Sequence, residues 1–198
     1  NMADSLYAIR KLVYEEKKVT MEELKEALAW NYGKGIDAQA AADITTIVMQ
    51  KLQENGISVN EQTATAVMTA ALGTEPSPEK KARFEEIHKM IDEVPKFGND
   101  IPDVDYFARD VAYTYTRPLQ KYMNPRGGHY QAGLYPVSAN VPLGGQTGAT
   151  PDGRYAHTPV ADGVSPSAGK DVKGPTAAAT SVSRLDHFIV SNGTLFNQ

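Results

Sequence analysis

The sequence predicts an α/β protein with a helical first half, residues 1–123, and a second half, residues 124–198, that is rich in strands and loops. Two observations lead to this division. Apolar residues recur at helical spacing behind recognisable caps throughout the first half. From Pro125 onward Gly, Pro, Ser and Thr accumulate and no helical period continues, which favours short strands and turns.

Two helices are predicted at the N-terminal end. The apolar side of the first consists of Leu6, Ile9, Leu12 and Val13. The second is expected to begin at about residue 20, because Thr20 and Glu23 have the spacing of a capping box.

Residues 34–90 are predicted to form a helical insertion on the outside of the protein. Three residues within it, Asp37, Asn60 and Ser77, are good helix caps, and an apolar stripe follows each of them. Pro78 suits the first position of the helix that Ser77 caps. The apolar stripe of that helix consists of Phe84, Ile87, Met90, Ile91 and Val94.

The last helix of the first half is expected to start with Asp103 as its cap and to break at Pro118. Its apolar residues are Val104, Phe107, Val111 and Tyr115. In the second half, residues 129–141 and 185–193 are the predicted strands. Tyr135 and Val137 would share one face of the first strand, where they either belong to the core or line a cavity.

Composition excludes several classes of function. The net charge of −4 argues against a nucleic-acid partner or an anionic membrane surface, and no run of 18 apolar residues could span a membrane. With no cysteine, the chain has no disulfide, thiolate ligand or thiol nucleophile. The four histidines lack metal-ligand spacing, so we expect no metal in the chain; His88 is expected at the surface.

The glycine-rich stretch "GGQTGATPDG", residues 144–153, is interpreted as turn structure rather than as a phosphate loop, because no Gly-Lys-Ser/Thr follows. Asp152, Gly153 and Arg154 are predicted to form a structural turn held by a charge-assisted pair.

Several motifs, in this order, resemble the glycyl radical enzymes, the pyruvate formate-lyase-like superfamily. They are "ADSLYAIRKLVYEEKKVTMEELKEAL" (3–28), "PKFGND" (95–100), "NPRGGHYQAGLYPVSANVPLGGQTGATPDGR" (124–154), "PVADGVSPSAGKDVKGPTAAATSVSRLDHF" (159–188) and "SNGTLFNQ" (191–198). The resemblance implies that the chain is part of a ten-stranded α/β barrel, with residues 1–123 in a helical outer layer and 124–198 lining the barrel. In such a barrel Gly and Pro would form a rigid, dry wall around the radical chemistry.

The elements "ADGVSP" (161–166) and "GPTAA" (174–178) are similar to the dehydratase and lyase branch, which includes glycerol and 1,2-diol dehydratases and choline trimethylamine-lyase. The implied function is elimination of water or an amine from a small hydroxylated substrate. Pyruvate formate-lyase activity (formate C-acetyltransferase) and a non-catalytic accessory role are the alternatives. The resemblance also places Tyr135, Val137 and Asn140 in the substrate pocket.

The resemblance implies two reagents that this sequence does not contain. The family's radical glycine lies in an Arg-Val-x-Gly-Tyr setting, which none of the 16 glycines has, and the thiyl-forming cysteine is also missing. We therefore expect a fragment of a longer enzyme, inactive alone, with the glycyl radical on a segment outside this chain. Expected partners are a radical SAM activating enzyme with an iron–sulfur cluster and a second copy in a homodimer. The expected location is the cytoplasm, or a bacterial microcompartment within it.

Overall fold

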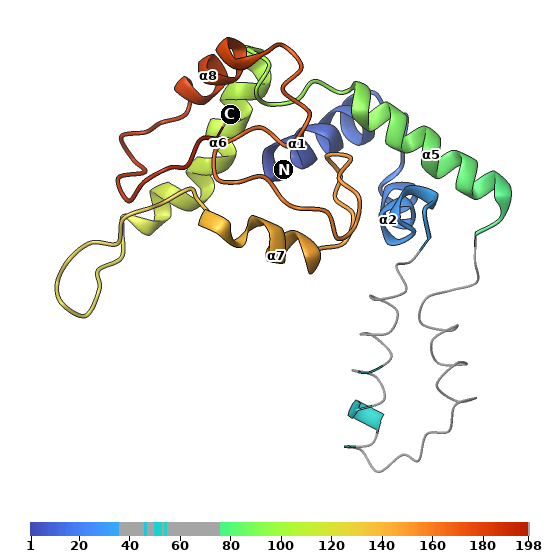
Figure 1. Cartoon of the computed structure of the whole chain (residues 1–198), viewed down its shortest axis with the longest axis horizontal. Helices are drawn as coiled ribbons and strands as arrows, with labels where there is room; N and C mark the ends of the chain where they lie inside the picture. The colour runs from blue at the N-terminus through green and yellow to red at the C-terminus, as the bar shows by residue number, and fades with distance from the viewer. Residues whose placement is uncertain (36–45, 47–49, 53, 55–75, 198) are drawn as a thin grey trace.

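The computed structural model describes residues 1–35, 46, 50–52, 54 and 76–197. The predicted caps Asp37 and Asn60 lie outside the described residues, as does most of the range 34–90. Figure 1 shows the segments of the second half wound around two helices of the first half, α1 (Met2–Ile9) and α6 (Pro102–Leu119).

The N-terminal part is helical, as predicted. Helix α1 spans Met2–Ile9 and continues as the π-helical segment η1, Arg10–Glu15. Helix α2, Met21–Ala29, begins with the predicted capping box, in which the Thr20 hydroxyl accepts from Glu23 N and the Glu23 carboxylate accepts from Thr20 N. A short 3-10 turn, η2, follows at Asn31–Gly33.

Helix α5, Pro78–Glu93, begins where the sequence predicts, with the Ser77 hydroxyl accepting from Lys80 N and Pro78 in the first turn. Its buried side chains are Phe84, Ile87 and Ile91. They pack against the core rather than facing solvent, so this helix is an integral part of the fold.

Helix α6, Pro102–Leu119, differs from the prediction at both ends. Its N-cap is Ile101, and Pro102 occupies the first turn, so Asp103 lies one residue inside the helix. The Asp103 carboxylate instead accepts a hydrogen bond of 2.6 Å from the Tyr7 hydroxyl on α1. Pro118 lies inside the last turn, and the helix continues for only one residue beyond it, to Leu119.

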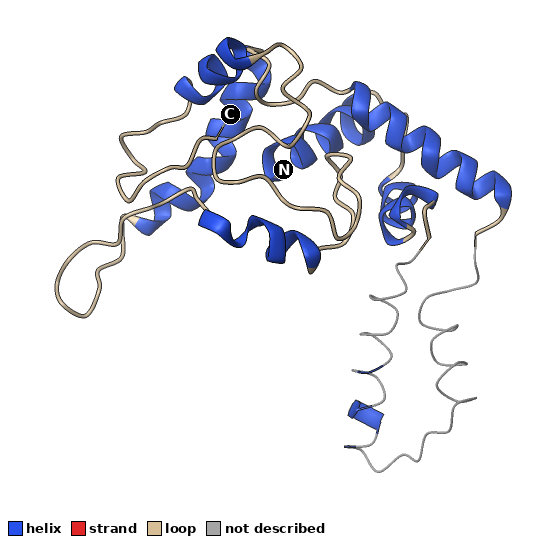
Figure 2. Cartoon of the chain, viewed as in Figure 1, coloured by secondary structure: helices blue, strands red, loops and turns tan. Residues whose placement is uncertain are grey.

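The prediction of strands in the second half is wrong for the described residues. Figure 2 shows helices and loops but no strand there, and the ladder contacts are the isolated bridges Met123–His129 and Leu134–Thr194. After Pro136 the chain turns into a 3-10 segment, η3 (Val137–Ala139), and then helix α7 (Asn140–Gly145). A ladder needs consecutive paired residues, and this turn ends the extended segment after one pair.

The second half also contains a helix that the sequence analysis missed, α8 at Pro175–Ser183. Its buried residues Ala178, Ser181 and Val182 are mostly small, so they produce no apolar stripe of the usual kind. Helix α8 packs beside α6. No helix among the described residues is long and apolar enough to cross a membrane.

Candidate functional site

Three loop segments that are far apart in sequence meet next to α6: residues 132–135, 162–165 and 192–197. Backbone hydrogen bonds join the first and third, from Leu134 N to Gly193 O and from Asn192 N to Ala132 O, each 3.0 Å. The second joins the third through Val164 N and Leu195 O at 2.9 Å. We call this arrangement the loop crossing.

Gly163 allows the three segments to approach closely. Its φ is +71°, and a Cβ at this position would lie 2.5 Å from Leu195 O and 2.9 Å from Leu134 O. Both are backbone atoms that cannot move aside without displacing their segments. Any other residue at position 163 would therefore separate the segments.

Tyr135 leaves the loop crossing on its outer side. The residue is 41% exposed, and its hydroxyl has no hydrogen-bond partner among the described residues. Val137 lies in η3, and Asn140 is the first residue of α7. Tyr135 and Val137 do not share a strand, so strand alternation does not place them on one face, and their role in a pocket stays a prediction.

The Asp152–Gly153–Arg154 stretch forms a tight turn in which Gly153 N donates to Thr150 O and Thr150 N donates to Arg154 O, both 3.0 Å. Asp152 is 2% exposed and accepts from the Thr150 hydroxyl at 2.5 Å and from the Asn1 amide at 2.6 Å. Burial opposes its charge, yet these hydrogen bonds outweigh burial and lower the pKa of Asp152.

The predicted direct charge pair within this turn is not what holds Arg154. Its guanidinium donates to backbone carbonyls instead: those of Thr147, Gly148, Tyr155 and Thr158. Burial lowers the pKa of Arg154. A planar guanidinium with several donors can hold a loop together in this way, because it donates hydrogen bonds to several backbone carbonyls at once.

The stretch "PKFGND" joins α5 to the N-terminal helix. Lys96 is buried, and its ammonium donates to Ile91 O and Val94 O at the C-terminal end of α5. Burial lowers the pKa of Lys96. Phe97 N donates to the Asp4 carboxylate at 2.8 Å, and burial raises the pKa of Asp4.

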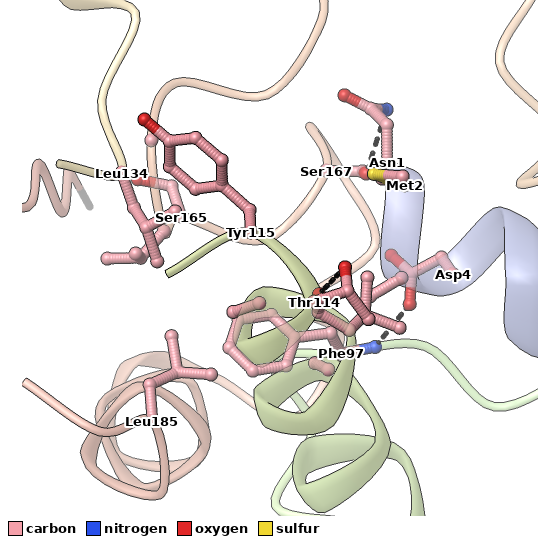
Figure 3. Close-up of a pocket in the computed structure, with 16 residues that line it drawn as sticks. Asn1, Met2, Asp4, Phe97, Thr114, Tyr115, Leu134, Ser165, Ser167 and Leu185 are labelled. Atoms are coloured by element: carbon pink, nitrogen blue, oxygen red, sulfur yellow. Dashed lines mark hydrogen bonds between the residues drawn. The ribbon is translucent and has the colours of Figure 1, made fainter. Parts of the chain in front are cut away.

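A cavity of about 320 Å³ lies between α1, α6 and the loop crossing. Figure 3 shows Leu134 and Ser165 from the crossing on one side, with Tyr115 and Leu185 nearby and Asp4 on the opposite side. The walls are mainly apolar. Tyr135 and Asn140 are not among the lining residues, and Leu134, next to Tyr135, is.

His88 does not lie at the surface as expected, since its side chain is only 13% exposed. Its Nε2–H donates to Gly153 O at 2.9 Å, and the ring stacks on Tyr155 with centroids 4.6 Å apart. A carbonyl only accepts, so Nε2 carries a proton, and Nδ1 lies 3.5 Å from the Tyr155 hydroxyl and 3.7 Å from a carboxylate oxygen of Asp92. His88 thus fastens the 150–154 turn to α5.

Sequence reasoning missed His88, Asp4 and Asn1, which become important only when distant segments meet. A carboxylate next to the apolar side of a helix, as Asp4 is, was the one available signal. Within the described ranges, no group of three His, Cys, Asp or Glu side chains is arranged to hold a metal ion.

Comparison with known proteins identifies the family. Residues 1–144 match the family model described as Pyruvate formate lyase-like, and residues 160–198 match the one described as Glycine radical. The loop crossing therefore joins both matched regions. The first match includes residues 34–90, whose status as an insertion stays a prediction.

Curated and solved relatives agree with this match. "Probable dehydratase YbiW" of Escherichia coli (strain K12) is 34% identical over 204 residues, covering 100% of this chain and 20% of that relative. A structure that concerns 1,2-propanediol dehydration in Roseburia inulinivorans is 60% identical with a TM-score of 0.88, covering 100% of this chain and 24% of that one.

The glycerol-bound form of the B12-independent glycerol dehydratase from Clostridium butyricum is 44% identical, with a TM-score of 0.71. That match covers 99% of this chain and 19% of the dehydratase. The chain thus spans about a fifth of the length of the relatives that it matches. These matches confirm the family indicated by the sequence motifs: the chain belongs to the pyruvate formate lyase-like family of glycyl radical enzymes.

Proposed function

We propose that the enzyme containing this segment is a glycyl radical C–O lyase that dehydrates a small vicinal diol, with 1,2-propanediol as its first substrate. The observation that carries the proposal is the 60% identity, at a TM-score of 0.88, to the structure concerned with 1,2-propanediol dehydration. The glycerol dehydratase is less similar, at 44% identity, so glycerol is the second choice. Elimination of an amine from choline is a third possibility within the same branch.

The reaction conserves all atoms: 1,2-propanediol becomes propanal and one water. A glycyl radical would supply the chemistry that breaks a C–H bond of the substrate. We place that glycine outside residues 1–198, because none of the 16 glycines is set in Arg-Val-x-Gly-Tyr.

We assign substrate binding in this segment to Tyr135, with Val137 and Asn140 beside it in sequence. The Tyr135 hydroxyl has no partner among the described residues, so it can donate a hydrogen bond to a substrate hydroxyl without losing another. The ring would at the same time exclude water from that hydrogen bond.

In the whole enzyme we expect a ten-stranded α/β barrel, with residues 124–198 lining it and 1–123 outside. The high TM-scores over the entire chain support this placement. Activation by a radical SAM enzyme with an iron–sulfur cluster, a homodimeric assembly and a cytoplasmic or microcompartment location follow from the same family membership and belong to the proposal.

The test uses the full-length enzyme, activated anaerobically, with the radical quantified by electron paramagnetic resonance. We expect propanal from 1,2-propanediol at a higher kcat/KM than product from glycerol or choline. Tyr135→Phe should lower kcat/KM by about tenfold, equivalent to one hydrogen bond of about 1.4 kcal/mol, with radical yield unchanged. Radical-containing enzyme that converts neither diol would refute the proposed function.

A further inference from the structure

Tyr135 rests on two glycines from different segments. A Cβ added to Gly133 would lie 2.7 Å from Cε1 and 3.3 Å from Cδ1 of the Tyr135 ring. A Cβ added to Gly193 would lie 3.4 Å from the same Cε1 atom. One edge of the ring therefore faces both glycines. It lies so close to them that side chains at these two positions would contact it.

The two glycines belong to the two halves of the loop crossing. Gly193 O accepts the 3.0 Å hydrogen bond from Leu134 N, and Leu134 forms a parallel bridge with Thr194. The Tyr135 ring lies against Gly193, the residue whose carbonyl accepts this hydrogen bond. Ring position and the pairing of residues 132–134 with 192–194 are therefore linked.

The same geometry separates the two sides of the extended segment. Leu134 lines the cavity, whereas Tyr135 does not. Tyr135 is 41% exposed and, in the described part of the chain, lacks a hydrogen bond that would orient its hydroxyl. The two glycines thus lie against one edge of a ring whose hydroxyl is not held by a hydrogen bond to the described residues.

We propose that Gly133 and Gly193 are positioning residues, forming a seat that holds the Tyr135 ring so that its hydroxyl meets the substrate. This inference rests on the proposed function, which assigns substrate binding to Tyr135. Because Gly193 lies in the region matched by the glycine radical family model and Gly133 in the region matched by the other, the seat exists only when the two regions are docked. Docking of the region that contains Gly193 and orientation of the substrate residue are then one structural event.

Gly133 gives the sharper test. It does not have the positive φ of Gly193, which is +107°, so alanine at 133 introduces a contact with the ring without imposing left-handed backbone strain. In the activated full-length enzyme we expect Gly133→Ala to lower kcat/KM for 1,2-propanediol by about tenfold to a hundredfold, as displacements of about 1 Å in positioning groups do.

The decisive arm is a double-variant cycle. In a Tyr135→Ala background the ring is gone, so adding Gly133→Ala should change kcat/KM by less than about twofold. Gly145→Ala is the matched control with unchanged kinetics, because a Cβ there has no atom within 4 Å and its φ is not positive. Gly193→Ala should lose activity in both backgrounds, since its strain does not depend on the ring.

These outcomes distinguish failure of the glycine seat from failure of the proposed function. Wild-type kinetics for Gly133→Ala, or an equal loss with and without the Tyr135 ring, overturns the seat and leaves Tyr135 as a substrate residue. Wild-type kinetics for Tyr135→Ala overturns the assignment of Tyr135 instead. If Gly133→Ala forms no radical, the Tyr135→Ala double variant should recover the radical signal, and failure to recover it also overturns the seat.

Discussion

Asp152 is a buried carboxylate that remains charged because its neighbours donate to both of its oxygens. The Thr150 hydroxyl and the Asn1 amide donate at 2.5 and 2.6 Å, and the residue is 2% exposed. Burial alone would raise the pKa of Asp152; with these hydrogen bonds the pKa falls below its ordinary value of 3.8. Folding therefore favours the ionised carboxylate. Asp152 stabilises the folded state fully at any pH at which its carboxylate is also ionised in the unfolded chain.

The pH dependence of this contribution has a definite sign. A lowered pKa in the folded state means that the stabilisation is complete above pH 3.8 and is lost as the pH falls from there through the folded pKa. Asp152→Asn should reduce the free energy of unfolding by about 2 kcal/mol at pH 7, the scale of hydrogen bonds to a charged group.

Urea denaturation between pH 3 and pH 7 measures the difference between wild type and Asp152→Asn. That difference should shrink below about pH 4. Asp171→Asn is the control for a generic loss of negative charge. A difference that stays constant with pH would mean that Asp152 acts through its shape alone.

At the scale of single residues, chemistry that arises from local sequence was predictable, and chemistry that arises from long-range contact was not. The sequence predicts the turn residues 152–154 as a unit. It cannot predict that Arg154 binds four carbonyls, or that His88 reaches Gly153 O from another segment. Those partners are fixed only when the loop folds back on α5.

Helices were predictable where the sequence contains both a cap and a stripe of large apolar residues. The start of α2 at Thr20 and the start of α5 at Ser77 follow from local hydrogen bonds that need no tertiary context. Helix α8 was missed because its buried face consists mainly of small residues, which suit close packing on α6. The predicted strand over residues 129–141 does not form, because Pro136 is followed by a turn rather than by further paired residues.

The stability of the helical part should depend on the buried face of α5. Ile87 is 0% exposed and belongs to the core shared with α1 and α2. Ile87→Ala should lower the free energy of unfolding by about 2–5 kcal/mol, since it removes buried methyl groups and leaves a cavity. Lys89→Ala, on the exposed side of the same helix, should change it by less than about 0.5 kcal/mol. Thermal and urea unfolding followed by circular dichroism measure both, and similar losses in the two variants would contradict the placement of this face in the core.

On the scale of the whole molecule, the chain contains two regions that match different family models. Residues 1–144 and 160–198 match different family models, and the 150–154 turn lies between these ranges. Asn1 donates to Asp152 and Ser167, so the start of the chain holds this turn against the second region.

The 198-residue chain alone should not support the proposed chemistry, whatever its stability. It contains no cysteine that could form a thiyl radical, and none of its 16 glycines has the Arg-Val-x-Gly-Tyr setting. After anaerobic treatment with the activating enzyme, we therefore expect no organic radical in the electron paramagnetic resonance spectrum and no conversion of 1,2-propanediol. The full-length enzyme, treated in parallel, should give both the radical signal and propanal, which shows that the activation conditions were adequate. A radical signal from the 198-residue chain would place the radical glycine within it, and the glycines of residues 160–198 would then be the first to substitute.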